Sequence, residues 1–147
     1  MENLPHITTR EYAEAVILLL SKARGPHGCE AEICAQVLLS AYNGFDWQLN
    51  VARLYSLSRE RYRAAITVIR GRAELAQEPQ DCIKDGDHHF ERLCQRWVRL
   101  HRDNRHKDIC SYCDGSGYIF YDKKGKYLEG GKRCNACRGN GFLGGEA

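Results

Sequence analysis

Four cysteines near the end of the chain lie in two identical blocks. Cys110 and Cys113 begin the first block, Cys134 and Cys137 begin the second, and both blocks read C-x-x-C-x-G-x-G. Two thiolates three residues apart can reach one metal ion from a tight turn, so two such turns complete a tetrahedral four-sulfur site. Glycine in each turn allows positive φ and close approach of the backbone to a metal-bound sulfur. The pattern therefore predicts one structural Zn²⁺ ion held by all four cysteines.

Paired cysteines have other uses, chiefly disulfides and burial as small apolar residues. A repeated pair that carries the same two glycines is more specific than a lone C-x-x-C and favours the metal. A thioredoxin-like redox motif would have one pair at the end of a strand in a βαβ unit, not two copies separated by a loop. Because four sulfurs leave no position for a water molecule, we expect a structural rather than a catalytic site.

The two blocks resemble the repeats of the cysteine-rich zinc domain of DnaJ-type co-chaperones. That domain has four repeats and two zinc ions, whereas this chain has two repeats and none of its prolines lies in a His-Pro-Asp signature. The half-size form in late-gene antitermination proteins of lambdoid bacteriophages is more similar, because a single pair of repeats is attached to helices there. The resemblance covers about residues 108–143 and implies a zinc module in a phage or mobile-element regulator.

The elements that must carry this module are expected to be helical. The last forty residues contain nine of the fourteen glycines and few large apolar side chains, so they need a metal as a staple. The expected fold is mainly α: a helical domain of about four to five helices over residues 1–105, followed by a zinc-knuckle β-hairpin module over residues 106–147. No export signal or membrane-spanning run is found, and the metal-type cysteines indicate a reducing cytosol, that of a bacterial host if the chain is phage-encoded.

Capping residues and apolar periodicity place the expected elements. Thr8 and Glu11 are spaced as a capping box, and Ser58 and Asp87 are the expected N-caps of two later helices. The expected helices cover residues 8–24, 29–43, 48–57, 58–76 and 88–102, and the expected strands cover residues 118–122 and 126–128. We expect the first helix to be central and buried, Cys34 to lie in the core, and the fourth helix to bury a stripe formed by Tyr62, Ala65, Ile66, Ile69 and Ala73.

Charge lies in blocks although the net charge is only +3. Residues 53–72 and 92–107 each carry a net charge of +5, while residues 1–52 and 73–91 carry −3 and −5. One interpretation is that these blocks neutralise one another in the fold, and the other is that arginines form a phosphate-facing surface. The best candidate for that surface is a ridge on the solvent face of the last helix and just beyond it, formed by Arg92, Arg96, Arg99 and Arg102.

The expected hairpin is a second candidate surface. It carries more aromatic and basic side chains than its own small core can use, namely Tyr118, Phe120, Tyr121, Tyr127, Lys123, Lys124 and Lys126. Such side chains suit stacking on nucleic-acid bases or gripping an extended peptide. The sequence assigns no role to Cys29, Cys82, His88 or His89; the two adjacent histidines point to different faces of a helix and cannot easily share one ion.

No catalytic constellation is found in the sequence, which has no G-x-S-x-G motif, no phosphate-cradling glycine loop followed by lysine, and no second metal cluster. We therefore expect a non-enzymatic protein with no small-molecule substrate and no membrane partner. The favoured hypothesis is a regulator that acts on DNA, RNA or a transcription complex, as the antitermination resemblance implies. The alternative is a protein-binding adaptor or inhibitor that docks on a host protein machine, or a chaperone-like binder of extended chains.

Overall fold

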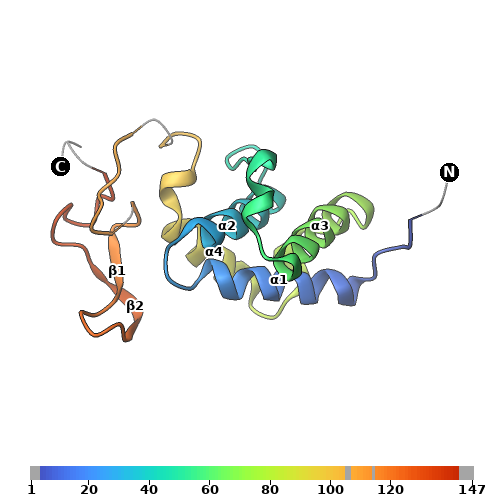
Figure 1. Ribbon diagram of the computed structural model, residues 1–147, viewed down its shortest axis with the longest axis horizontal. Helices are drawn as coiled ribbons and strands as arrows, with labels where there is room; N and C mark the ends of the chain where they lie inside the picture. The colour runs from blue at the N-terminus through green and yellow to red at the C-terminus, as the bar shows by residue number, and fades with distance from the viewer. Residues whose placement is uncertain (1–3, 105–106, 114, 143–147) are drawn as a thin grey trace.

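The computed structural model describes residues 4–104, 107–113 and 115–142. Within these residues, four α-helices and three short 3₁₀ helices precede one two-stranded antiparallel hairpin. The helices gather in one part of the molecule and the hairpin lies at the opposite end from the N-terminus (Figure 1). This confirms the predicted fold class, mainly α with a small C-terminal hairpin that bears cysteines. The domain boundary expected between residues 105 and 106 lies outside the described residues.

The bounds of the elements follow the local signals in the sequence closely at the N-terminal end. In chain order they are α1 (Thr9–Ala23), α2 (Cys29–Tyr42), η1 (Val51–Ser56), α3 (Arg59–Glu74), η2 (Pro79–Cys82), α4 (Gly86–Arg96), η3 (Val98–Leu100), β1 (Tyr118–Tyr121) and β2 (Tyr127–Arg133). The capping box of α1 is confirmed, because the Glu11 N–H donates to Thr8 Oγ1 at 3.1 Å and the Thr8 N–H donates to the Glu11 carboxylate at 2.9 Å. Ser58 caps α3, as predicted.

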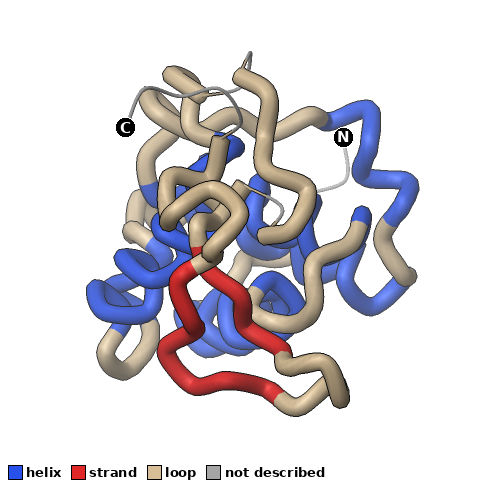
Figure 2. Tube along the Cα trace, turned by 90° about the vertical axis from the view of Figure 1, so that its left-hand side faces the viewer, coloured by secondary structure: helices blue, strands red, loops and turns tan. Residues whose placement is uncertain are grey.

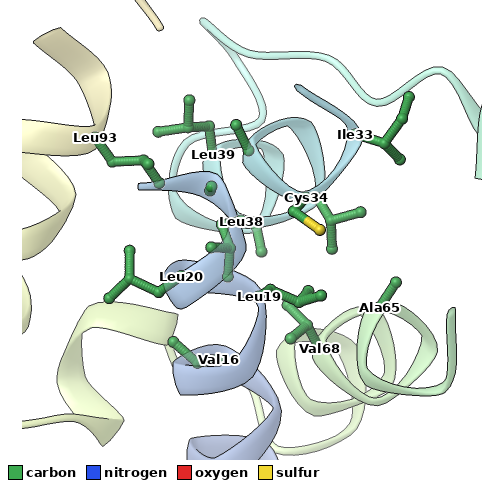
Figure 3. Close-up of a cluster of buried hydrophobic side chains, with 14 of the residues drawn as sticks. Val16, Leu19, Leu20, Ile33, Cys34, Leu38, Leu39, Ala65, Val68 and Leu93 are labelled. Carbon is green, nitrogen blue, oxygen red and sulfur yellow. The ribbon is translucent and has the colours of Figure 1, made fainter. Parts of the chain in front are cut away.

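The core forms where α1 packs against both α2 and α3. Figure 3 shows side chains from these three helices pointing toward one another, among them Leu19, Cys34 and Val68, each fully buried. Cys34 is thus a core residue, and burial raises the pKa of its thiol to about 12. α1 is central, as expected, because it packs against both α2 and α3, but it is not buried on all sides: Ile17 is 55% exposed, and Arg10, Glu14 and Ser21 are exposed as well.

The expected buried stripe of α3 is confirmed at Ala65 and wrong at most of its other positions. Tyr62, Ile69 and Ala73 are exposed and Ile66 is half-buried, and the buried face of α3 consists of Ala64, Ala65, Val68 and Gly71. The Tyr12 ring of α1 lies directly over Gly71, where any Cβ atom would overlap it. Small residues let α3 approach α1 closely, so the face with the larger apolar side chains is not the face that packs.

The expected last helix is also shorter than predicted. α4 begins at Gly86, after Asp85 in the left-handed conformation (φ 54°), and it ends at Arg96 instead of continuing to residue 102. At this point the fully buried Trp97 donates its indole N–H to the carbonyl of Ala23 at 2.9 Å. That long-range bond fixes Trp97 in a non-helical conformation, and the chain continues as the short η3 turn.

Candidate metal centre

The four cysteines of the C-x-x-C blocks meet at the open end of the hairpin. Their Sγ atoms all lie within 4.8 Å of one another, with 4.0 Å between Cys110 and Cys134 and 3.7 Å between Cys113 and Cys137. A tetrahedral ion with metal–sulfur bonds of about 2.3 Å holds its sulfurs about 3.8 Å apart, whereas a disulfide needs about 2.05 Å. None of the four is in a disulfide. The arrangement therefore fits a metal site.

We call the two C-x-x-C-x-G-x-G blocks the first and second knuckle. Each holds one of its sulfurs with a matching backbone hydrogen bond. The N–H of Gly117 donates to Cys113 Sγ and the N–H of Gly141 donates to Cys137 Sγ, each at 3.2 Å. The chain ends of the module meet where the Cys110 N–H donates to the carbonyl of Gly141 at 2.9 Å. The N–H groups of Gly117 and Gly141 favour the thiolate over the thiol form of the cysteines they contact, because a charged acceptor makes a stronger hydrogen bond.

The knuckles also interlock through their glycines. Gly117 and Gly141 have φ values of 82° and 84°, which side chains disfavour. A Cβ atom on Gly117 would lie 2.5 Å from the carbonyl oxygen of Gly139, and one on Gly141 would overlap the carbonyl oxygen of Gly115. Each knuckle therefore needs a glycine where the backbone of the other passes, which explains why the glycines repeat with the cysteines.

Electrostatics in the cluster differ between the buried and the half-buried thiols. Burial raises the pKa of the Cys113 thiol to about 12. Burial also acts against the charged form of Cys137, but the Gly141 N–H and the neighbouring thiols outweigh it and lower that pKa to about 7. A divalent cation among four sulfurs favours the thiolate form of all of them. Four thiolates around a divalent ion would carry a net charge of −2. The guanidinium of Arg133, whose Nε donates to the carbonyl of Arg138 at 2.9 Å, lies beside the second knuckle and offsets part of that charge.

The hairpin leaves the metal centre as two paired strands, which Figure 2 shows in red. The register pairs Tyr118 with Arg133 and Tyr121 with Tyr127, with an irregularity between Ile119 and Tyr121. The three lysines of the turn region, Lys123, Lys124 and Lys126, are exposed. Tyr118 and Tyr127 are 43% and 46% exposed, while Phe120 and Tyr121 are half-buried. The hairpin therefore exposes both the basic and the aromatic side chains that the sequence analysis identified as candidates.

The expected arginine ridge is wrong at its centre. Arg96 is only 5% exposed, because its guanidinium donates to the carbonyl of Gly25 and lies over the Phe120 ring, 4.3 Å from the centroid. Burial lowers the pKa of Arg96 from its usual value. Arg92 is exposed, as expected. The break at Trp97 ends the helix on which the ridge depended.

The other two arginines of that ridge pair within the fold. Arg99 Nη1 lies 2.8 Å from the Glu32 carboxylate of α2, and Arg102 Nε lies 3.4 Å from Asp46. The side chain of Arg99 also lies against Gly115, since a Cβ atom at that glycine would be 2.7 Å from Arg99 Cβ. Arg99 thus connects the helical part to the first knuckle. The sequence could not show this, because Glu32 is far from Arg99 along the chain.

The structure gives contacts to several residues for which the sequence suggested no role, among them Arg24, His89 and Cys29. Arg24, at the C-terminal end of α1, lies 3.4 Å from His89 Nδ1, and both line a hollow beside the hairpin. Burial, and then Arg24, lower the pKa of His89. His88 and His89 belong to no metal-binding cluster among the described residues. Exposed Cys29 accepts a hydrogen bond from Arg53 at 3.1 Å.

Among the described residues no helix is both long and apolar enough to cross a membrane. In comparison with known proteins, residues 13–98 fit a family model described as a family of unknown function (DUF7673). This match covers more than half of the chain, from within α1 to the turn after α4, and ends before the first cysteine of the metal centre. No curated protein and no solved structure matches the chain.

Proposed function

The chain belongs to a family of unknown function (DUF7673), and we propose that it is a non-enzymatic binding protein whose zinc-stabilised hairpin acts on nucleic acid or a transcription complex. The proposal rests on residues of this chain, because the family match stops before the metal centre. The observation that carries it is a hairpin, joined at its open end by the four-cysteine cluster, that exposes three lysines and two tyrosines beside the helical part.

Zinc is the proposed ion because of the donor set. Four thiolates in a closed tetrahedral arrangement are typical of structural Zn²⁺ sites, and they leave no open position for a reacting water. All four of Cys110, Cys113, Cys134 and Cys137 would hold one ion, with the knuckle N–H groups as the outer shell. The ion would supply folding energy to a segment with little apolar core of its own.

Nucleic acid is the proposed target because of the side chains on the hairpin surface. Lys123, Lys124 and Lys126 can neutralise phosphates, and Tyr118 and Tyr127 offer ring faces on which bases stack. The two C-x-x-C-x-G-x-G blocks resemble those of phage antitermination proteins, which favours a phage or mobile-element regulator working in the cytosol of a bacterial host. The proposal includes no membrane partner and no small-molecule substrate.

One observation favours the second candidate, a protein-binding adaptor or inhibitor. Tyr112, in the first knuckle, is 78% exposed and stands with the hairpin aromatics on the same small module. Exposed aromatic side chains are typical anchors of protein interfaces. In this alternative, Tyr118, Phe120, Tyr121 and Tyr127 would contact a host protein or an extended chain.

Affinity purification from a bacterial lysate, with and without nuclease, separates the two candidates. The nucleic-acid proposal predicts that captured material is lost after nuclease treatment, and that the purified protein shifts labelled nucleic acid with a steep dependence on salt. A variant with Lys123→Gln, Lys124→Gln and Lys126→Gln should bind more weakly. Capture of one protein that survives nuclease, together with no binding to any nucleic acid, would replace this proposal with the adaptor.

A further inference from the structure

A groove runs between the hairpin and the helical part. One hollow of about 460 Å³ lies between β1, β2 and the C-terminal end of α1, and a second of about 160 Å³ lies between the hairpin and α4. The two hollows share Arg24 and Tyr127. We call them together the hairpin groove.

The charged side chains that line the hairpin groove are all basic. They are Arg24, Lys84, Arg92 and Arg96, and no aspartate or glutamate lines either hollow. In the described part of the chain, neither Arg24 nor Arg92 lies within ion-pair distance of a carboxylate, unlike Arg99 and Arg102. The groove therefore has the positive potential that attracts an anion.

Arg96 adds a second, independent indication of an anionic ligand. Its guanidinium is buried without a carboxylate partner among the described residues, and its Nε makes no hydrogen bond there. Its partners are instead the carbonyl of Gly25 and the Phe120 ring. A buried cation that lacks an opposite charge is costly, so a nearby anion would offset that cost.

The groove also offers aromatic rings beside these charges. The rings of Tyr121 and Tyr127 lie 5.5 Å apart between centroids, and both line the larger hollow, as do the apolar residues Ile17 and Leu20. Phe120 lines the smaller hollow. Cationic side chains interleaved with rings are the features that bind unpaired nucleotides, with phosphates at the cations and bases on the rings.

We infer that the hairpin groove binds a single-stranded segment of nucleic acid, with phosphates at Arg24 and Arg92 and a base against Tyr127. This inference rests on the proposed function and places its site in the groove instead of on the outer arginine ridge. The larger hollow has the size of a pocket that holds one small ligand, so the groove admits unpaired nucleotides but not a duplex. Lys123 and Lys124, which do not line the groove, would guide the strand toward it.

The test compares two variants that each lose two positive charges. Arg24→Gln with Arg92→Gln removes the groove contacts, and Arg59→Gln with Arg63→Gln removes two exposed arginines of α3 that do not line the groove. Binding of labelled oligothymidylate, oligouridylate and a mixed-sequence duplex is measured by fluorescence anisotropy on the zinc-loaded protein, between about 50 and 200 mM salt. Circular dichroism checks that both variants are folded.

The groove variant should bind single strands about 25-fold more weakly at about 0.1 M salt, because two lost phosphate contacts reduce the log–log salt slope by about 1.4. The control variant should stay within about threefold of the unchanged protein, which should prefer single strands to the duplex. Equal losses in the two variants, or equal affinity for the duplex, would overturn the groove assignment and leave the proposed function standing. No binding of the unchanged protein to any of the three probes would overturn both.

Discussion

The interlocked knuckles make a sharp prediction for one glycine. Gly117→Ala places a methyl group 2.5 Å from the carbonyl oxygen of Gly139, on the opposite knuckle, at a φ of 82°. The Gly117 N–H is also the donor to Cys113 Sγ at 3.2 Å. The substitution therefore strains the backbone, displaces the second knuckle and weakens a hydrogen bond to a sulfur of the four-cysteine cluster.

Gly125 provides a matched control for the backbone term. Its φ is 81°, nearly the same as that of Gly117, but no atom lies within 4 Å of the position of its Cβ. Alanine in the left-handed region costs about 1–2 kcal/mol, and both variants incur this cost. Only Gly117→Ala adds the clash and the weakened bond to sulfur, and a hydrogen bond to a charged group contributes about 1.5–3 kcal/mol.

The expected result is a loss of metal affinity confined to one variant. A total cost of about 3–5 kcal/mol corresponds to a decrease of at least about 100-fold for Gly117→Ala, while Gly125→Ala should stay within about threefold because its strain is local to the turn. Zn²⁺ affinity is measured by competition with a chelating dye, and Co²⁺ substitution reports tetrahedral sulfur ligation by its absorption. If the two variants bind zinc equally well, the interlock does not shape the site. If the unchanged protein binds no metal, the hypothesis that the four cysteines hold one metal ion is itself refuted.

Three further changes test the helical part and its independence from the metal. Gly71→Ala should destabilise the protein by at least about 1–3 kcal/mol in urea, because the methyl group would overlap the Tyr12 ring, whereas Ala73→Gly on the exposed face should cost about 1 kcal/mol. The Ser58 N–H and an arginine lower the pKa of Glu30 despite the opposing effect of burial; this stabilisation is present above the ordinary pKa of a glutamate and is lost as pH falls below about 4.5. Glu30→Gln should therefore cost under about 1 kcal/mol at neutral pH, and the difference from the unchanged protein in urea unfolding should vanish in acid. Removing the metal with a chelator should abolish binding to nucleic acid while leaving the helical circular dichroism nearly unchanged, since the core of α1, α2 and α3 contains none of the four ligands.

Features set by neighbours in the sequence were predictable, and those set by distant residues were not. The knuckles and the caps of α1 and α3 follow from residues within a few positions of one another. The end of α4 depends on the bond from Trp97 to the carbonyl of Ala23, 74 positions away. No periodicity in residues 88–102 could reveal that contact. The predicted arginine ridge therefore assumes a helix that continues beyond Arg96, where α4 ends.

The same long-range contacts explain why the arginines took roles other than the expected one. A helical wheel shows which side chains share one face of a helix, but it does not show which distant segments of the chain pack against that face. Here the hairpin covers Arg96 with Phe120, and the first knuckle covers the stem of Arg99. Two arginines of the expected ridge, Arg96 and Arg99, thus contact the module from the helical part. Arg24 and Arg92, which have no carboxylate within ion-pair distance among the described residues, line the groove beside the hairpin. The groove is therefore lined both by the helices that the family match covers and by the hairpin that lies beyond it, so a relative that had only the helices would lack the site proposed here.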